Sequence, residues 1–140
     1  MDRKASARWE GGLKDGKGTI STESGVLEAN YSFKKRFEDE KGTNPEELIG
    51  AAHASCFSMA LSMILGDKGY TADSIETSAK VTLSQSDAGF DISKIHLDVV
   101  ADISGADDAA FQEAAETAKA NCPVSKVLNA EITMTATLKG

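Results

Sequence analysis

Apolar and polar residues alternate along several segments of this chain, and the alternation predicts β-strands. Pairs such as Asp15–Gly16 separate the first three segments, which favours an antiparallel meander. In the segment after Gly89, the phase slips by one residue at Ser93–Lys94, which indicates a β-bulge. The expected strands cover residues 4–10, 18–22, 26–33, 75–83, 90–103 and 131–139.

A long helix is predicted between residues 45 and 65, and the sequence marks its start clearly. Asn44 is a suitable N-cap, and Pro45 suits the first helical position. Glu46 and Glu47 favour the positive end of the helix dipole. Asn44 together with Glu47 also resembles a capping box.

This long helix is apolar on more than one face, because apolar residues fill neighbouring stripes between positions 48 and 64. A helix with such a pattern is surrounded by protein. In a small domain, a sheet can cover one side of the helix and a partner subunit the other. Gly66 or Gly69 is expected to end the helix.

Two further helices are expected near the end of the chain. Residues 107–120 show an amphipathic pattern, and residues 123–128 form a short helix with Cys122 in its N-cap position. The resulting order of elements, βββ-α-ββ-αα-β, gives the α+β fold class. With this length and no repeat, we expect a single domain over residues 1–140.

The segment 34–41 is charged throughout except for Phe37, and it is interpreted as a solvated loop. An aromatic residue in a charged run usually docks against the protein and can carry its neighbour with it. Arg36 is therefore the residue of this segment to examine.

The composition is that of an ordinary globular protein. The 140 residues are 41% hydrophobic and 26% charged, with a net charge of −7. This charge argues against nucleic acid or an anionic membrane as the main partner, because both attract basic surfaces. The first residues contain no apolar signal segment, and the apolar run 51–65 is judged too short to cross a bilayer. We therefore expect a cytoplasmic protein.

The two cysteines are the main candidates for chemistry. A reducing compartment disfavours a structural disulfide, so they are interpreted as free thiols, a metal pair or a redox pair. In its apolar helix, Cys56 can also be an inert buried residue. Cys122 at a helix start lies beside unpaired backbone N–H groups that favour a thiolate, although Cys122–Pro123 can simply form a turn. Spacing alone does not show whether the two sulfurs meet.

Glu46 precedes Cys56 by ten residues on the same expected helix. This corresponds to about 15 Å along the axis and roughly 80° around it, so the carboxylate cannot easily touch the thiol of its own chain. If the two cooperate, either the helix start is bent or Glu46 comes from a second chain in a C2 dimer. Compensation of the helix dipole alone also explains Glu46.

The two histidines are weaker candidates. His53 lies one turn before Cys56, which allows a Cys/His nucleophile pair, but a buried histidine bonded to a backbone carbonyl explains it better. His96 lies in a strand beside Asp98 and is expected to be exposed. A metal site built on His53, Cys56 and Cys122 lacks an obvious fourth ligand.

Two motifs carry the cysteines: GTNPEELIGAAHASCFSMA at residues 42–60 and NCPVS at residues 121–125. Both resemble motifs of the OsmC/Ohr family, named after osmotically inducible protein C and organic hydroperoxide resistance protein. The resemblance spans essentially the whole chain, and the pair of motifs is far more specific than either one. The position of Arg36 just before the long helix, with Ser-Thr-Glu-Ser-Gly at 21–25, resembles the OsmC branch.

This resemblance implies a fold in which antiparallel sheets wrap around a central buried helix, in an intertwined homodimer with both sites at its interface. It implies a thiol-dependent peroxidase of the stress response that reduces organic hydroperoxides, and hydrogen peroxide less well, without a metal or other cofactor. By position, Cys56 matches the peroxidatic thiolate that becomes a sulfenic acid, and Cys122 matches the resolving thiol of an intrachain disulfide. Arg36 matches the active-site arginine, and Glu46 its paired carboxylate. The implied reductant is a dithiol, such as a lipoylated protein.

Physical chemistry agrees with these implied roles. A buried thiol has a raised pKa and is inert unless a cation favours its thiolate. Arg36 would supply the cation, and a bidentate pair with Glu46 would hold the guanidinium in place. The candidates for an apolar lining that accepts the alkyl part of a peroxide are Leu48, Phe57, Met59 and Met63.

Two other functions stay open at this point. The first is a redox-sensing or stress-associated binding protein whose disulfide changes its interactions without sustained turnover. The second is a purely structural dimer with buried thiols. Steady-state consumption of an alkyl hydroperoxide with a dithiol separates the first from a peroxidase, and alkylation of the native protein tests the second.

Overall fold

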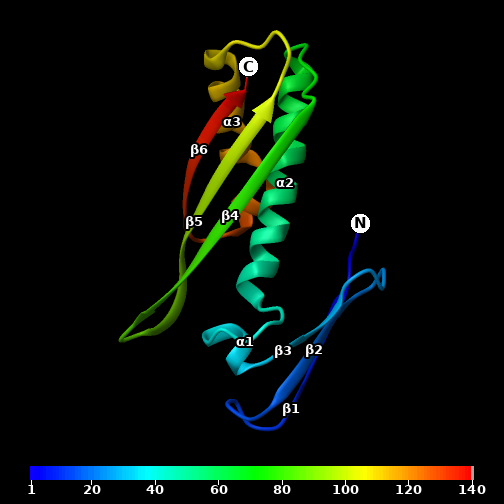
Figure 1. The fold of residues 1–140 in the computed structure, drawn as a ribbon, viewed down its shortest axis with the longest axis vertical. Helices are drawn as coiled ribbons and strands as arrows, with labels where there is room; N and C mark the ends of the chain where they lie inside the picture. The colour runs from blue at the N-terminus through cyan, green and yellow to red at the C-terminus, as the bar shows by residue number, and fades with distance from the viewer. Residues whose placement is uncertain (140) are drawn as a thin grey trace. The chain divides into compact units, whose positions relative to one another are not determined.

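The computed structural model describes residues 1–139, and these form two compact units that meet in the chain between Leu48 and Ile49. The expectation of one domain over residues 1–140 stays a prediction. The elements (Figure 1) are β1 (Ala5–Glu10), β2 (Lys17–Thr22), β3 (Glu28–Tyr31), α1 (Phe33–Phe37), α2 (Pro45–Asp67), β4 (Ser74–Ser86), β5 (Gly89–Asp102), α3 (Asp108–Asn121), α4 (Pro123–Val127) and β6 (Glu131–Lys139).

The first unit contains an antiparallel meander in the order β1-β2-β3, as the alternating pattern predicts. Gly18 of β2 lies opposite both Trp9 and Tyr31 in the register. The two rings approach to 5.4 Å between centroids. A Cβ atom at Gly18 would lie 2.5 Å from the Tyr31 ring, so the aromatic pair requires glycine there.

The interpretation of residues 34–41 as a loop is wrong for its first part, because α1 occupies Phe33–Phe37. The Ser32 hydroxyl caps this short helix by accepting the N–H of Lys35 at 3.2 Å. One turn apart, the rings of Phe33 and Phe37 pack with centroids 4.9 Å apart. Local capping and an i,i+4 aromatic contact therefore give helical structure to a segment dominated by charge.

Both ends of the long helix α2 follow the sequence signals. The Asn44 side chain accepts the N–H of Glu47 at 2.8 Å, which confirms the N-cap. At the other end, the N–H of Tyr70 donates to the carbonyl of Leu65 at 2.9 Å. Gly69 adopts a φ of +88° between them, which completes a Schellman ending.

The second unit contains a sheet in the order β4-β5-β6. Strands β4 and β5 form the expected hairpin, and its register shift leaves Ser93 as the extra residue of the bulge. Strand β6 pairs with β5 in parallel, so this sheet is mixed and the expectation of purely antiparallel sheets is wrong here. The connection from β5 to β6 passes through α3 and α4, and such a crossover is what parallel neighbours need.

Helices α2 and α3 cover one face of this sheet (Figure 1), and the core lies between them and the strands. On another side of α2, Met59 and Met63 are 76% and 64% exposed. The sequence predicts that protein surrounds α2, and its own chain packs against one side of this helix. The fully buried apolar side chains are Phe57, Leu61 and Leu65 of α2, Ile95, Leu97, Val99 and Ala101 of β5, and Phe111, Ala114, Ala115 and Ala118 of α3.

The expectation that the apolar run is too short for a membrane needs correction. α2 has 23 residues and contains an 18-residue window with a mean hydropathy of 1.7, so it has the length and composition of a membrane-crossing segment. Core helices share this property, and one face of α2 packs into the core through Phe57, Leu61 and Leu65.

Candidate active site

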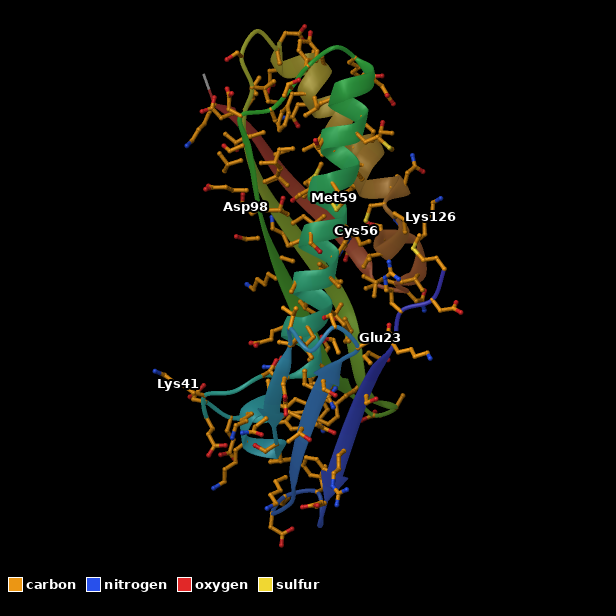
Figure 2. All side chains as sticks on the ribbon, turned by 90° about the vertical axis from the view of Figure 1, so that its right-hand side faces the viewer. Glu23, Lys41, Cys56, Met59, Asp98 and Lys126 are labelled. Carbon is orange, nitrogen blue, oxygen red and sulfur yellow. The ribbon has the colours of Figure 1, made fainter. Side chains whose placement is uncertain are left out.

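Two free thiols in the second unit lie next to one another on different elements. Cys56 is half-buried on α2, and Cys122 is fully buried at the N-cap of α4. Cys122 lies near enough to Cys56 to raise the pKa of the Cys56 thiol. Figure 2 shows Cys56 on α2, with α4 and its labelled residue Lys126 beside it. The structure therefore answers the question that the spacing left open.

The environment of Cys56 opposes its ionisation. Burial raises the pKa of the Cys56 thiol, and the neighbouring Cys122 raises it further. The backbone of Val124, in the first turn of α4, acts in the opposite direction. The net direction is upward, so the neutral thiol is favoured at neutral pH. A nucleophilic role for Cys56 requires a cation.

Cys122 is held by a chain of hydrogen bonds that ends at His53. Its sulfur accepts the backbone N–H of Ser125 at 3.3 Å and lies 3.3 Å from the Ser125 hydroxyl. That hydroxyl is 2.7 Å from Nε2 of His53 on α2. His53 and Cys122 are fully buried, and Ser125 is 8% exposed. The chain of contacts thus fixes the sulfur inside the protein.

His53 is buried as expected, but its partner is a side chain and not a backbone carbonyl. Its Nε2 is used by Ser125, and its Nδ1 has no hydrogen-bond partner among the described residues. Burial lowers the pKa of His53, which keeps the imidazole neutral. No Cys/His nucleophile pair with Cys56 is formed. Ser125 is a site residue that sequence reasoning missed, and its signal was its position three residues after the N-cap Cys122.

Arg36 and Glu46 form a bidentate ion pair in the first unit. Nε of Arg36 donates to both carboxylate oxygens of Glu46, at 3.1 and 3.2 Å, and Nη2 donates to Oε1 at 2.7 Å. The side chains are 37% and 11% exposed, respectively. The guanidinium also lies 5.3 Å from the ring centroid of Phe37, so the aromatic residue does carry its neighbour into a defined position.

The four candidate residues form two separate pairs, one in each unit. Cys56 and Cys122 are adjacent in the second unit, and Arg36 and Glu46 are bonded in the first. The first pair provides sulfur chemistry, and the second provides a pre-oriented cation with free N–H groups.

The residues expected to line an apolar pocket fall into different environments. Phe57 is a core residue with no exposed surface, so its assignment to a substrate lining is wrong. Met59 and Met63 are exposed on α2 and can contact an apolar molecule, whereas Leu48 is half-buried. His96 is half-buried and hydrogen-bonds to Thr133 and Thr135 at 2.6 and 3.2 Å, so it is less exposed than expected.

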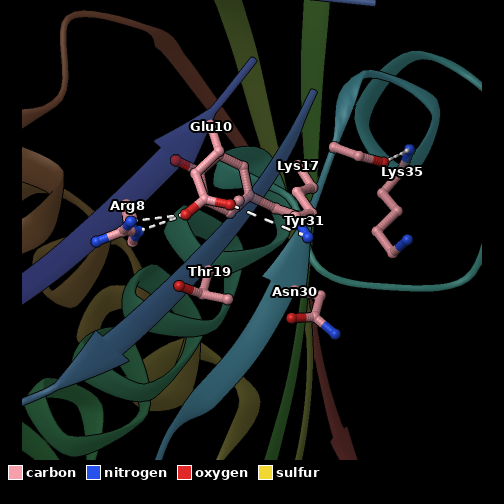
Figure 3. A pocket seen from close by; sticks show the side chains of 9 residues that line it. Arg8, Glu10, Lys17, Thr19, Asn30, Tyr31 and Lys35 are labelled. Carbon is pink, nitrogen blue, oxygen red and sulfur yellow. Dashed lines mark hydrogen bonds and ion pairs between the residues drawn. The ribbon is translucent and has the colours of Figure 1, made fainter. Parts of the chain in front are cut away.

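An open groove of about 540 Å³ lies on the first unit (Figure 3), with Tyr31 among its lining residues. Its charged side chains take part in ion pairs: Glu10 contacts Arg8 at 2.6 Å and Lys17 at 4.0 Å, and Lys35 contacts the exposed Glu40 at 2.7 Å. No cysteine lines this groove, so it offers no thiol chemistry.

Metal chemistry has no evident location in the part of the chain that the structure describes. Within residues 1–139, no group of three or more histidine, cysteine, aspartate or glutamate side chains is placed to hold a metal ion.

Comparison with known proteins gives a consistent result. The family model described as OsmC-like protein matches residues 38–137. The chain is 58% identical to peroxiredoxin OsmC of Escherichia coli (strain K12) over 140 residues, which covers 99% of this chain and 98% of that protein. It is 32% identical to the organic hydroperoxide resistance protein OhrB of Bacillus subtilis (strain 168), over 87% of this chain and 89% of the relative. The crystal structure of OhrB superposes with a TM-score of 0.72 and 28% identity, covering 99% of this chain and 98% of that chain.

Proposed function

Because the chain belongs to the OsmC-like family, we propose that it is a thiol-dependent peroxidase that reduces organic hydroperoxides, and hydrogen peroxide less well. The observation that carries this proposal is the adjacency of the free thiols Cys56 and Cys122. The relatives' names, a peroxiredoxin and organic hydroperoxide resistance proteins, support it.

In the proposed reaction, the Cys56 thiolate attacks one oxygen of the peroxide. The O–O bond breaks, an S–O bond forms, and the alkoxide leaves with a proton as an alcohol. The resulting sulfenic acid condenses with the Cys122 thiol, which forms the S–S bond, breaks the S–O bond and releases water. A dithiol reductant, such as a lipoylated protein, then reduces the disulfide and restores both thiols. No cofactor takes part in these steps.

The Arg36–Glu46 ion pair supplies the positive charge that the Cys56 thiolate needs in this reaction. The raised pKa of Cys56 means that its thiolate needs a nearby positive charge. Arg36 carries that charge, and Glu46 fixes the guanidinium so that its remaining N–H groups can face sulfur or a peroxide oxygen. We assign both residues to the active site on this basis.

We further propose a homodimer in which Glu46 and Arg36 of one subunit serve Cys56 of the other. Along α2, Glu46 lies ten residues from Cys56, or about 15 Å, which favours a second chain as the source of the pair. The exposed methionines Met59 and Met63 give α2 an apolar side suited to a partner. The proposed location is the cytoplasm, with neither nucleic acid nor a membrane as a partner.

Cysteine variants test the proposed function. Cys56→Ser should abolish hydroperoxide consumption, whereas Cys122→Ser should allow one oxidation event per chain and then stop because no disulfide forms. Consumption of cumene hydroperoxide with dihydrolipoamide as the reductant measures both. Turnover that persists in Cys56→Ser would end this assignment. A disulfide that forms in the wild type without sustained turnover would instead favour a redox sensor.

A further inference from the structure

His53 and Ser125 have no role in the proposed reaction, although both are buried and belong to a hydrogen-bond chain that ends at the Cys122 sulfur. Its three side chains come from α2, from α4 and from the N-cap of α4, and they are 0%, 8% and 0% exposed for His53, Ser125 and Cys122. Burying an imidazole and a hydroxyl is costly unless they are bonded, so the contacts at 2.7 and 3.3 Å stabilise this arrangement.

The unpaired Nδ1 of His53 fixes the direction of the chain. A neutral imidazole carries one N–H, and a buried N–H without an acceptor is rarer than a buried acceptor without a donor. The proton is therefore assigned to Nε2, which donates to the Ser125 hydroxyl. Because the Cys122 sulfur is the other partner of that oxygen among the described residues, the hydroxyl hydrogen is assigned to the bond with this sulfur. The same sulfur accepts the backbone N–H of Ser125, so two donors converge on it.

We propose that His53 and Ser125 are positioning residues that hold two hydrogen-bond donors on the Cys122 sulfur and so accelerate its attack on the Cys56 sulfenic acid. This inference rests on the proposed function. It concerns only the second step, in which the peroxide has already left as an alcohol.

The electron and proton balance of that step shows where the donors act. The Cys122 sulfur attacks the Cys56 sulfur, the S–S bond forms and the S–O bond breaks. The Cys56 sulfenic sulfur is reduced and the Cys122 sulfur is oxidised, while the Cys122 proton joins the departing hydroxide as water. Negative charge grows on the Cys122 sulfur as its proton leaves, and donors placed beforehand stabilise that charge without reorganisation. His53 contributes by orienting the hydroxyl and does not itself change protonation.

Variants of the full chain can separate this role from a structural one. Ser125→Ala removes the hydroxyl, and His53→Leu removes the donor that orients it. His53→Gln restores a donor, because the glutamine side-chain amide nitrogen can take the place of Nε2 but cannot titrate. Ser58→Ala is the control: it removes another hydroxyl bond of 2.7 Å on α2, which goes to Thr77 and takes no part in the chain of contacts to Cys122.

The experiment follows both steps after one equivalent of cumene hydroperoxide is mixed with reduced protein. Quenched samples are analysed by mass spectrometry, with dimedone as the trap for sulfenic acid. We expect Cys56 oxidation at the wild-type rate in every variant. Disulfide formation should be at least about tenfold slower in Ser125→Ala and His53→Leu, with sulfenic acid accumulating, and close to wild type in His53→Gln and Ser58→Ala.

Each other outcome decides against the inference. Equal rates of disulfide formation in Ser125→Ala and the wild type would overturn it, and so would equal slowing in His53→Gln and His53→Leu. Slowing of both steps together in these variants would indicate a merely structural role. If the wild type itself forms no sulfenic acid at Cys56, the proposed function fails, and the inference fails with it.

Discussion

Replacing Glu46 with glutamine tests whether the ion pair, and not the charge at the helix start, serves the thiol. The substitution removes the negative charge and one of the two oxygens that receive three N–H contacts from Arg36, at 2.7 to 3.2 Å. A hydrogen bond to a charged group contributes about 1.5–3 kcal/mol. Because the Arg36 side chain is 37% exposed, water screens the pair, and about 1–2 kcal/mol of orienting free energy is a better figure.

If that energy is needed to hold the guanidinium at the thiolate, the rate constant for Cys56 oxidation should fall about 5- to 30-fold. Stopped-flow mixing with cumene hydroperoxide measures this rate before any recycling. The matched control is Glu47→Gln, which removes the same charge from the first turn of α2. Glu47 contacts Thr43 at 3.1 Å and, in the structure, no arginine. The control should leave the oxidation rate within about twofold of the wild type.

Equal loss of the oxidation rate in the two variants would contradict a role for the ion pair. It would mean that the helix dipole, to which Glu46 and Glu47 contribute alike, accounts for the effect. An unchanged rate in both variants would show that Arg36 does not need its carboxylate partner.

Three further predictions follow from the same structure. Mixing equal amounts of Arg36→Gln and Cys56→Ser subunits, each inactive alone, should restore about a quarter of wild-type turnover if the pair acts across a dimer, and none if it acts within one chain. Met63→Glu should convert the dimer into monomers, as measured by light scattering, because the 64% exposed side chain lies on the apolar side of α2. Leu61→Ala should instead lower the free energy of unfolding by about 2–5 kcal/mol, because Leu61 is fully buried in the core. Burial lowers the pKa of His53, so the imidazole binds a proton more readily in the unfolded chain than in the folded one. The free energy of unfolding should therefore decrease as the pH drops below about 6.5. In urea titrations, His53→Gln should lack the share of this decrease that comes from His53.

The sequence predicts α2 well because its signals are local. Asn44, Pro45 and the first-turn glutamates act on neighbouring backbone groups, and the structure keeps the cap that they predict. The bulge at Ser93 was also predictable, since a slip in a period-two pattern shows in the residues themselves. The parallel pairing of β6 with β5 was not predictable from the sequence. Alternation shows which face of a sheet a residue lies on, but it does not show whether the neighbouring strand is parallel or antiparallel.

The site shows the same division between local and distant information. Cys122 at a helix start is visible in NCPVS, and so is the position of Ser125, but the bond from Ser125 to His53 joins residues 72 positions apart. No pattern in the chain predicts such a contact. The short helix α1 was not predicted for another reason. Its many charged residues suggested a loop, although the Ser32 cap and the spacing of Phe33 and Phe37 favour a helix.

Peptide mass spectrometry of the wild-type protein after one equivalent of cumene hydroperoxide tests the roles of the two cysteines. We expect one alcohol released per chain and a crosslinked peptide that joins Cys56 to Cys122 of the same chain through a disulfide that a dithiol reduces. Peroxide consumed while Cys56 stays a free thiol would contradict the central claim, as would oxidised Cys56 that never pairs with Cys122.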